Sequence, residues 1–162
     1  MKIKGLHELM LEQLEDVYDA EHQIVEALPK LAEAAASPEL KTAFNDHLAQ
    51  AHNHIERLEQ AFKSLGETPA RKTCKGMQGL IQEGDEMLEM DADPAVMDAG
   101  LIAAAQRVEH YEMAGYGTLR TYAHLMNHTE AGRLFQQTLE DEEVADKKLS
   151  QIATRINVEA LN

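Results

Sequence analysis

Apolar residues recur along the chain at alternating steps of four and three positions. Residues at this spacing lie on one face of an α-helix, and helices with such faces pack at shallow angles around a shared core. In the first segment with this spacing the series is Met10, Leu14, Val17, Glu21, Ile24, Leu28, Leu31 and Ala35. Three later segments repeat the pattern, so the chain is predicted to form four long amphipathic helices.

Residues that start and end helices separate these segments. Ser37–Pro38 and Asp93–Pro94 each place a capping residue before a proline, which suits the first position of a helix. Gly66 stands where a helix-ending glycine is expected, and Thr129 can cap the last helix. The predicted helices cover residues 5–35, 38–65, 94–126 and 130–157.

The connection between the second and third of these helices is nearly thirty residues long. A structureless loop of that length is uncommon inside a compact domain. The stretch MQGLIQEGDEMLEM has the helical spacing of apolar residues, which predicts a short fifth helix over residues 77–90. Two helical hairpins joined by one long crossover have the connectivity of ferritin-like bundles. The predicted fold is therefore one all-α, ferritin-like domain over residues 1–162.

Each apolar series is interrupted near its midpoint by polar side chains. Glu21 interrupts the first series, and Glu112 and Glu142 interrupt the third and the fourth. The second carries His47 and His54. Since helices of similar length align their midpoints in a bundle, these groups are expected to meet at one level of the core.

Carboxylates that meet inside a bundle need compensation for their charge. Burying an ionised carboxylate alone costs on the order of several kcal/mol, and like charges at close range force protonation. A bound divalent or trivalent cation removes both problems. The predicted metal ligands are Glu21, His54, Glu109, Glu112, Glu142 and Asp146. The alternative is a protonated or hydrogen-bonded polar core, the relic of an ancestral metal site.

Other polar residues near these positions are expected to have structural roles. His47 is two turns from His54 and is interpreted as a hydrogen-bonded core histidine. Asp141 and Glu143 are interpreted as part of a solvated outer face, which is also the competing interpretation of Asp146.

An internal repeat supports a site shared between two halves of the chain. VYDAEHQ in the first helix parallels VEHYEMA in the third, and the alignment places Glu21 opposite Glu112. From Glu21 to His54 is 33 positions, and from Glu112 to Asp146 is 34. Each hairpin is therefore expected to supply half of a two-metal site.

Composition and charge narrow the range of partners. The formal net charge is −14, which repels nucleic acid and anionic membranes. Cys74 is the single cysteine, so no intrachain disulfide can form. The N-terminus has no apolar secretory segment, and the longest apolar run, AGLIAAA, is too short for a bilayer. A cytoplasmic protein is expected.

Four stretches resemble the YciF-type bacterial stress proteins, a branch of the ferritin-like superfamily. They are DVYDAEHQIVEALPKLA, AFNDHLAQAHNHIERLE, LIAAAQRVEHYEMAGYGTL and TLEDEEVADKKL, and together the match covers nearly all of residues 5–155. The resemblance implies a four-helix bundle with a crossover helix, self-association and a role connected with stress. In the wider superfamily each hairpin gives one glutamate and a Glu-x-x-His pair to a di-iron or di-manganese centre.

The chain departs from that superfamily pattern in its second and fourth helices. Gln50 stands where the resemblance implies a glutamate, and His54 follows it by four positions instead of three. The fourth helix offers Glu142 and Asp146 but no histidine. A single metal or an asymmetric pair is therefore an alternative to a full dinuclear centre.

Two functions follow from this pattern. The first is an oxidoreductase that uses iron, or alternatively manganese, in a dinuclear centre to activate dioxygen or peroxide. The alternative is a non-catalytic structural or binding protein of the stress response with a degenerate metal site. A homodimer is expected in both cases. A ferritin-style cage is a weaker alternative, because the chain shows no assembly signal.

Overall fold

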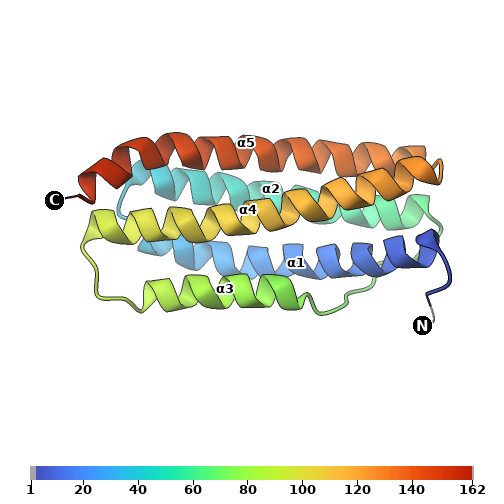
Figure 1. Ribbon diagram of the computed structural model, residues 1–162, viewed down its shortest axis with the longest axis horizontal. Helices are drawn as coiled ribbons and strands as arrows, with labels where there is room; N and C mark the ends of the chain where they lie inside the picture. Colours follow the sequence, from blue (N-terminus) through green and yellow to red (C-terminus); the bar gives the residue numbers. More distant parts are fainter. Residues whose placement is uncertain (1–2, 162) are drawn as a thin grey trace.

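A computed structural model describes residues 3–161 of the chain and contains five helices (Figure 1). The helices are α1 (Leu6–Ala34), α2 (Pro38–Ser64), α3 (Lys75–Leu88), α4 (Pro94–Leu125) and α5 (Thr129–Glu159). No strand occurs among these residues, so the predicted all-α fold class is confirmed. Residues 1, 2 and 162 of the predicted domain lie outside the described part. The crossover helix begins two residues before the predicted position 77 and ends two before position 90.

The four long helices form two antiparallel hairpins. Figure 1 shows α1 and α2 as one hairpin, α4 and α5 as the other, and α3 lying outside the bundle. The hairpins pack through contacts of α2 with α5 and of α1 with α4. The crossover helix α3 contacts α1 and α4 and covers one side of the bundle. No helix of the described residues has the length and apolarity that a membrane span requires.

The ends of the helices follow the turn residues only in part. Ser37 caps α2, because its hydroxyl oxygen accepts a hydrogen bond from the Leu40 amide, and Gly66 ends that helix with a φ of 75°. Asp93 precedes α4 without a side-chain capping bond. The expected cap at Thr129 is wrong, because Thr129 is the first residue of α5 and His128 takes the capping position without a side-chain bond.

The apolar core consists of two clusters, one toward each end of the bundle. One cluster contains Ile24, Leu28, Phe44, Leu101 and Ile152, and the other contains Leu14, Leu58, Tyr116, Leu119 and Phe135. Along α2, α4 and α5, the residues between the two clusters include His54, Glu112 and Glu142. The polar interruptions therefore lie between two dry layers, and these layers exclude water from both ends of the polar level.

The core-facing residues of α4 match only half of the series that the spacing of four and three predicts, which is Leu101, Ala105, Val108, Glu112, Gly115, Leu119, Tyr122 and Met126. The buried residues of this helix are Asp98, Leu101, Ile102, Ala104, Ala105, Glu109, Glu112, Tyr116, Leu119 and Ala123. Val108, Gly115 and Tyr122 of the predicted series are only partly buried. The helix is therefore rotated so that both Glu109 and Glu112 face the core.

Side-chain contacts hold the crossover in place. Asp19 of α1 accepts hydrogen bonds from the Arg71 guanidinium and from the Cys74 amide, each at 2.8 Å. The Cys74 sulfur lies 3.1 Å from the hydroxyl oxygen of Tyr111 in α4. At Gly76 an added Cβ would lie 2.6 Å from the Tyr111 ring, so glycine is required for α3 to approach α4 this closely.

Candidate metal centre

Six side chains with metal-binding atoms meet between the two core clusters. They are Glu21 of α1, His47 and His54 of α2, Glu109 and Glu112 of α4, and Glu142 of α5. All six are at most 5% exposed. They form two groups, within each of which the potential ligand atoms lie within 4.8 Å of one another. Glu142 belongs to both groups, so it is placed to bridge two positions.

The first group, which we call the His54 half, contains Glu21, His54 and Glu142. The Nδ1 atom of His54 lies 3.1 Å from Oε1 of Glu21 and 3.0 Å from Oε1 of Glu142. The Tyr116 hydroxyl donates a 2.5 Å hydrogen bond to the same Glu21 oxygen. His54 therefore contacts both carboxylates of the His54 half directly, without a metal ion between them.

Outside this half, the other nitrogen of His54 is also engaged. Its Nε2 atom lies 3.3 Å from Oδ2 of Asp141, and Arg57 donates a 2.6 Å hydrogen bond to that oxygen. A metal-binding histidine commonly donates its second N–H to a carboxylate, which fixes the tautomer and the ring orientation. Asp141 thus leaves Nδ1 of His54 as the nitrogen that faces Glu21 and Glu142.

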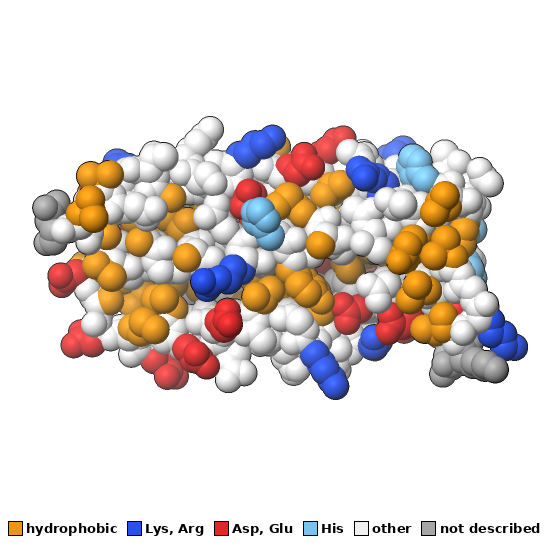
Figure 2. Space-filling view, viewed as in Figure 1, with side chains coloured by type: hydrophobic (Ala, Val, Ile, Leu, Met, Phe, Trp, Pro, Cys, Tyr) orange, Lys and Arg blue, Asp and Glu red, His pale blue; other side chains and the backbone are white. Residues whose placement is uncertain are grey.

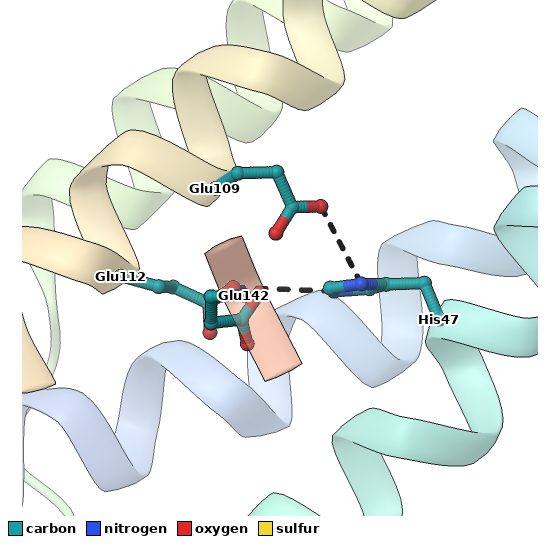
Figure 3. A group of neighbouring side chains, drawn as sticks. All are labelled: His47, Glu109, Glu112 and Glu142. Atoms are coloured by element: carbon teal, nitrogen blue, oxygen red, sulfur yellow. Dashed lines mark ion pairs between the residues drawn. The ribbon is translucent and has the colours of Figure 1, made fainter. Parts of the chain in front are cut away.

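The second group contains His47, Glu109 and Glu112 together with the shared Glu142. We call His47, Glu109 and Glu112 the His47 half. Figure 3 shows the four side chains pointing toward one another from α2, α4 and α5. Nδ1 of His47 lies 3.4 Å from Oε1 of Glu109, and Nε2 lies 3.9 Å from Oε2 of Glu112. Neither contact is a hydrogen bond, because both ring nitrogens of His47 lack a hydrogen-bond partner.

Buried polar atoms without hydrogen-bond partners concentrate at this centre. Among the described residues these atoms belong to Glu21, His47, Glu109, Glu112 and Glu142, with His22 Nε2 as the exception. Both oxygens of Glu112 and of Glu142 are in this set. Native proteins leave few such atoms unpaired, because each costs about 1–3 kcal/mol. Oxygen and nitrogen donors of this kind bind divalent metal ions, so the residues present fit a metal site.

Burial and mutual repulsion change the protonation of the carboxyl groups. Burial raises the pKa of Glu109 and of Glu112 well above the usual value, and the negative charge of Glu142 raises both further. Burial also opposes the ionisation of Glu142, but Glu109 and His54 beside it outweigh this and lower its pKa to about 2. Without a cation, protons therefore neutralise Glu109 and Glu112.

The His54 half is instead neutralised by the imidazole. Burial lowers the pKa of His54, but the charges of Glu21, Asp141 and Glu142 outweigh it and raise that pKa to about 11. The contact with His54, together with Arg57, lowers the pKa of Asp141 to about 2. Metal-free His54 is therefore a cation among carboxylates, and a metal at its Nδ1 would replace a proton.

Five of the predicted ligands come together and one does not. Glu21, His54, Glu109, Glu112 and Glu142 lie in the two groups. Asp146 lies outside both groups, where it accepts a hydrogen bond from Gln106 and pairs with His110 at 3.3 Å. Gln50 is also outside the groups and only partly buried.

Sequence reasoning missed three residues around the centre. The interpretation of His47 as a hydrogen-bonded core histidine is wrong, because neither ring nitrogen has a hydrogen-bond partner, and the ring groups instead with carboxylates of three glutamates, their ligand atoms within 4.8 Å of one another. Asp141 is not simply a solvated acid, since it contacts buried His54. Tyr116 was not predicted, although its spacing of four from Glu112 and seven from Glu109 places all three on one helical face.

Comparison with known proteins identifies the family of the chain. Residues 5–162 match the family described as "Domain of unknown function (DUF892)". Protein YciF of Escherichia coli is 41% identical over 164 residues, which covers 100% of this chain and 99% of YciF. The crystal structure of the E. coli stress protein YciF has a TM-score of 0.92, and the match covers 95% of this chain and 98% of that one.

Two further solved structures extend the comparison. YcfI of Rhodopseudomonas palustris is 42% identical with a TM-score of 0.89, and the match covers 92% of this chain and 95% of that one. A ferritin-like diiron-carboxylate protein of Bacillus anthracis has a TM-score of 0.71 over 93% of this chain and 99% of that one. At 16% identity the second likeness shows the fold alone. The resemblance in the four sequence stretches is thereby confirmed: the chain is similar to YciF throughout its length, its fold is ferritin-like, and it belongs to the DUF892 family.

Proposed function

We propose that this protein binds iron, or alternatively manganese, in a dinuclear centre at the middle of the bundle and uses it in oxidant chemistry during stress. The observation that carries the proposal is the set of buried, unpartnered oxygen and nitrogen atoms from four helices. One position would be held by Glu21 and His54 and the other by His47, Glu109 and Glu112. Glu142, which belongs to both groups, would bridge them.

The residues around the centre have distinct roles in this proposal. A carboxylate-bound iron or manganese pair supplies electrons to dioxygen or peroxide when it is bound. Asp141 holds the proton on Nε2 of His54, so that Nδ1 faces the carboxylates. Tyr116 fixes one oxygen of Glu21 through its hydroxyl group. The two apolar clusters exclude water above and below and strengthen every electrostatic interaction at the centre.

The stress role is carried over by similarity, and the homodimer is the expectation that the sequence resemblance raised. The E. coli relative is called a stress protein, and we extend that role to this chain because the two match over their full lengths. Light scattering of the purified protein tests the dimer: a mass near twice the 18.1 kDa of one chain is expected, and a monomer would contradict it.

Metal content tests the central part of the proposal. Protein purified without added metal, then titrated with Fe(II) without oxygen, is expected to bind close to two ions per chain. The double variant Glu112→Ala with Glu142→Ala is expected to bind none, whereas Glu143→Ala, an exposed neighbour on α5, is expected to match the natural protein. Equal iron content in all three proteins would reject the centre.

A non-catalytic binding protein is the second candidate function. It is favoured by Gln50, because α2 contributes no carboxylate to either group, and by the position of Asp146 outside both groups. Oxidant consumption separates the two functions. If the iron-loaded protein consumes neither dioxygen nor peroxide, the centre stores or senses metal and does not turn over.

A further inference from the structure

An apolar pocket opens beneath the crossover helix and ends at the candidate metal centre. Its volume is about 40 Å³, and residues of α1, α2, α3 and α4 line it. The apolar lining includes Leu28, Phe44, Ile81, Ala105 and Val108. At its inner end are His47 and Glu109, two members of the His47 half. The pocket therefore joins the surface beside α3 to one of the two proposed metal positions.

A glycine that packing does not require keeps part of this pocket open. At Gly76 and Gly100 of the α3–α4 contact, an added Cβ would collide with Tyr111 or with Met87. At Gly84, which lines the pocket, an added Cβ would meet only the Cβ of Ala104, at the ordinary contact distance of 4.0 Å. Glycine inside a helix costs about 1 kcal/mol relative to alanine. Gly84 thus leaves space where a larger side chain would fit.

The lining selects against charged and strongly polar molecules. Except for His47, Glu109 and Asp85, the side chains that line the pocket are apolar. Asp85 pairs with Lys30 at 3.5 Å, and Figure 2 shows acidic side chains gathered over the end of α3 and its connection to α4, at the lower left. Anions are repelled there, and a peroxide would lose hydrogen bonds that the apolar walls cannot replace.

A second pocket reaches the same two residues from the opposite side. It lies between α2 and α5, has a volume of about 130 Å³ and contains Gln50 as well as the ion pair of Lys148 with Asp46. Metal ions and other polar species therefore have an approach of their own that contains polar and charged side chains. This leaves the pocket under α3 without a role in the entry of polar reactants.

We propose that the pocket under α3 binds a small, uncharged, apolar molecule the size of dioxygen and presents it to the His47 half. The proposal rests on the proposed function in that the centre is what the molecule meets. Apolar protein cavities of about 150 Å³ stay dry and bind benzene or xenon. A volume of about 40 Å³ is smaller, so it admits a diatomic molecule and excludes an aromatic ring.

Xenon serves as the probe, because it is apolar, uncharged and detectable by its effect on neighbouring nuclei. The full chain, freed of metal by chelation, is titrated with xenon under pressure while methyl and imidazole resonances are recorded. We expect saturable shifts of the Leu28, Ile81 and Val108 methyl groups and of the His47 ring with one common affinity. Methyl groups of Leu58 and Leu119, in the far cluster, are expected to stay unchanged.

Two glycines of the same helix provide the matched variants. Gly84→Leu is expected to weaken xenon binding at least fivefold by filling the pocket, and Gly84→Ala is expected to weaken it less without disturbing the fold. Gly79→Leu places the same side chain at an exposed position with no atom within 4 Å of its Cβ, so binding should be unchanged. The absence of saturable shifts, a His47 ring that does not respond, or equal effects of Gly84→Leu and Gly79→Leu would overturn the proposal.

The xenon result is independent of metal content. Should the metal titration fail while xenon binds, the proposed function falls and the pocket remains. Should iron bind with two ions per chain while xenon does not, the pocket proposal falls alone.

Discussion

The two halves of the candidate centre contain similar residues but balance their charges differently. In the His54 half, an imidazolium, a tyrosine hydroxyl and a nearby Asp141–Arg57 pair surround the carboxylates. Unpartnered carboxylate oxygens occur in both halves, but only in the His47 half do both nitrogens of the histidine also lack hydrogen-bond partners. Protein side chains balance the negative charge of the His54 half, whereas in the His47 half only protons on the carboxyl groups remove the charge.

The difference indicates how the chain folds before it binds metal. Fixed charges organise the His54 half, so this part of the core can form with the bundle. The His47 half stays neutral as long as Glu109 and Glu112 keep their protons, and a cation would release those protons on binding. Each prediction below tests this contrast, beginning with the largest expected effect.

Glu142, which both halves share, is expected to be the most sensitive position. Glu142→Ala removes the carboxylate that faces His54 and leaves a buried imidazolium with less compensation, so the metal-free protein should lose about 3 kcal/mol of unfolding free energy. Metal content should fall below one ion in ten chains. Chemical denaturation and elemental analysis measure the two effects. Glu143→Ala is the control, and a matching loss in that variant would show that the effect is not specific.

Glu112→Gln is expected to separate metal binding from stability. Glutamine resembles the protonated form that Glu112 takes in the metal-free protein, so unfolding free energy should change by less than about 0.5 kcal/mol. At least one ion per chain should nevertheless be lost, because the amide carries no charge. A large loss of stability without metal would show that Glu112 is ionised in the metal-free core.

Asp141→Asn tests whether the surface carboxylate controls His54. Loss of such a partner typically lowers metal affinity about 10–100-fold, because the imidazole tautomer and orientation are no longer fixed. Asp146→Asn makes the same chemical change five residues later on α5, outside both groups, and should change affinity less than about threefold. Isothermal titration of both variants gives the comparison, and equal affinities would remove the special role of Asp141.

The metal-free protein is expected to become more stable as the pH falls from 8 to 5.5. The pKa values of Glu109 and Glu112 are raised on folding, so their contribution is complete below an unfolded pKa near 4.5 and declines as the pH rises. The same sign holds for His54, whose contribution is complete below 6.5 and is lost as the pH rises toward a folded pKa of about 11. The gain should be on the order of 1 kcal/mol by denaturant titration. Added metal should reverse this slope, and a metal-free protein that loses stability over this range would contradict the assignment of protons.

The sequence by itself determined the helices and the level at which the polar groups meet. The alternation of four and three is a property of helical geometry, so it is visible in the order of residues before any packing is known. Prolines and glycines mark where the helices begin and end, and the lengths of the connections between them allow few ways of joining the helices into a bundle. For the same reason Glu21, Glu112 and Glu142 stand out, since each occupies a position that apolar neighbours define as buried.

Only the tertiary structure decided which atoms around that level meet. The turn of α4 about its axis, set by packing against α1, α3 and α5, brings Tyr116 and Ala123 to the core in place of Gly115 and Tyr122. His47 and His54 are seven residues apart on α2, which is about 10.5 Å along a helix, yet their ring centroids approach to 6.4 Å. Asp141 reaches His54 only because α5 lies beside α2. Local spacing determines which face of a helix a side chain occupies, whereas contacts between side chains depend on how whole helices are placed against one another.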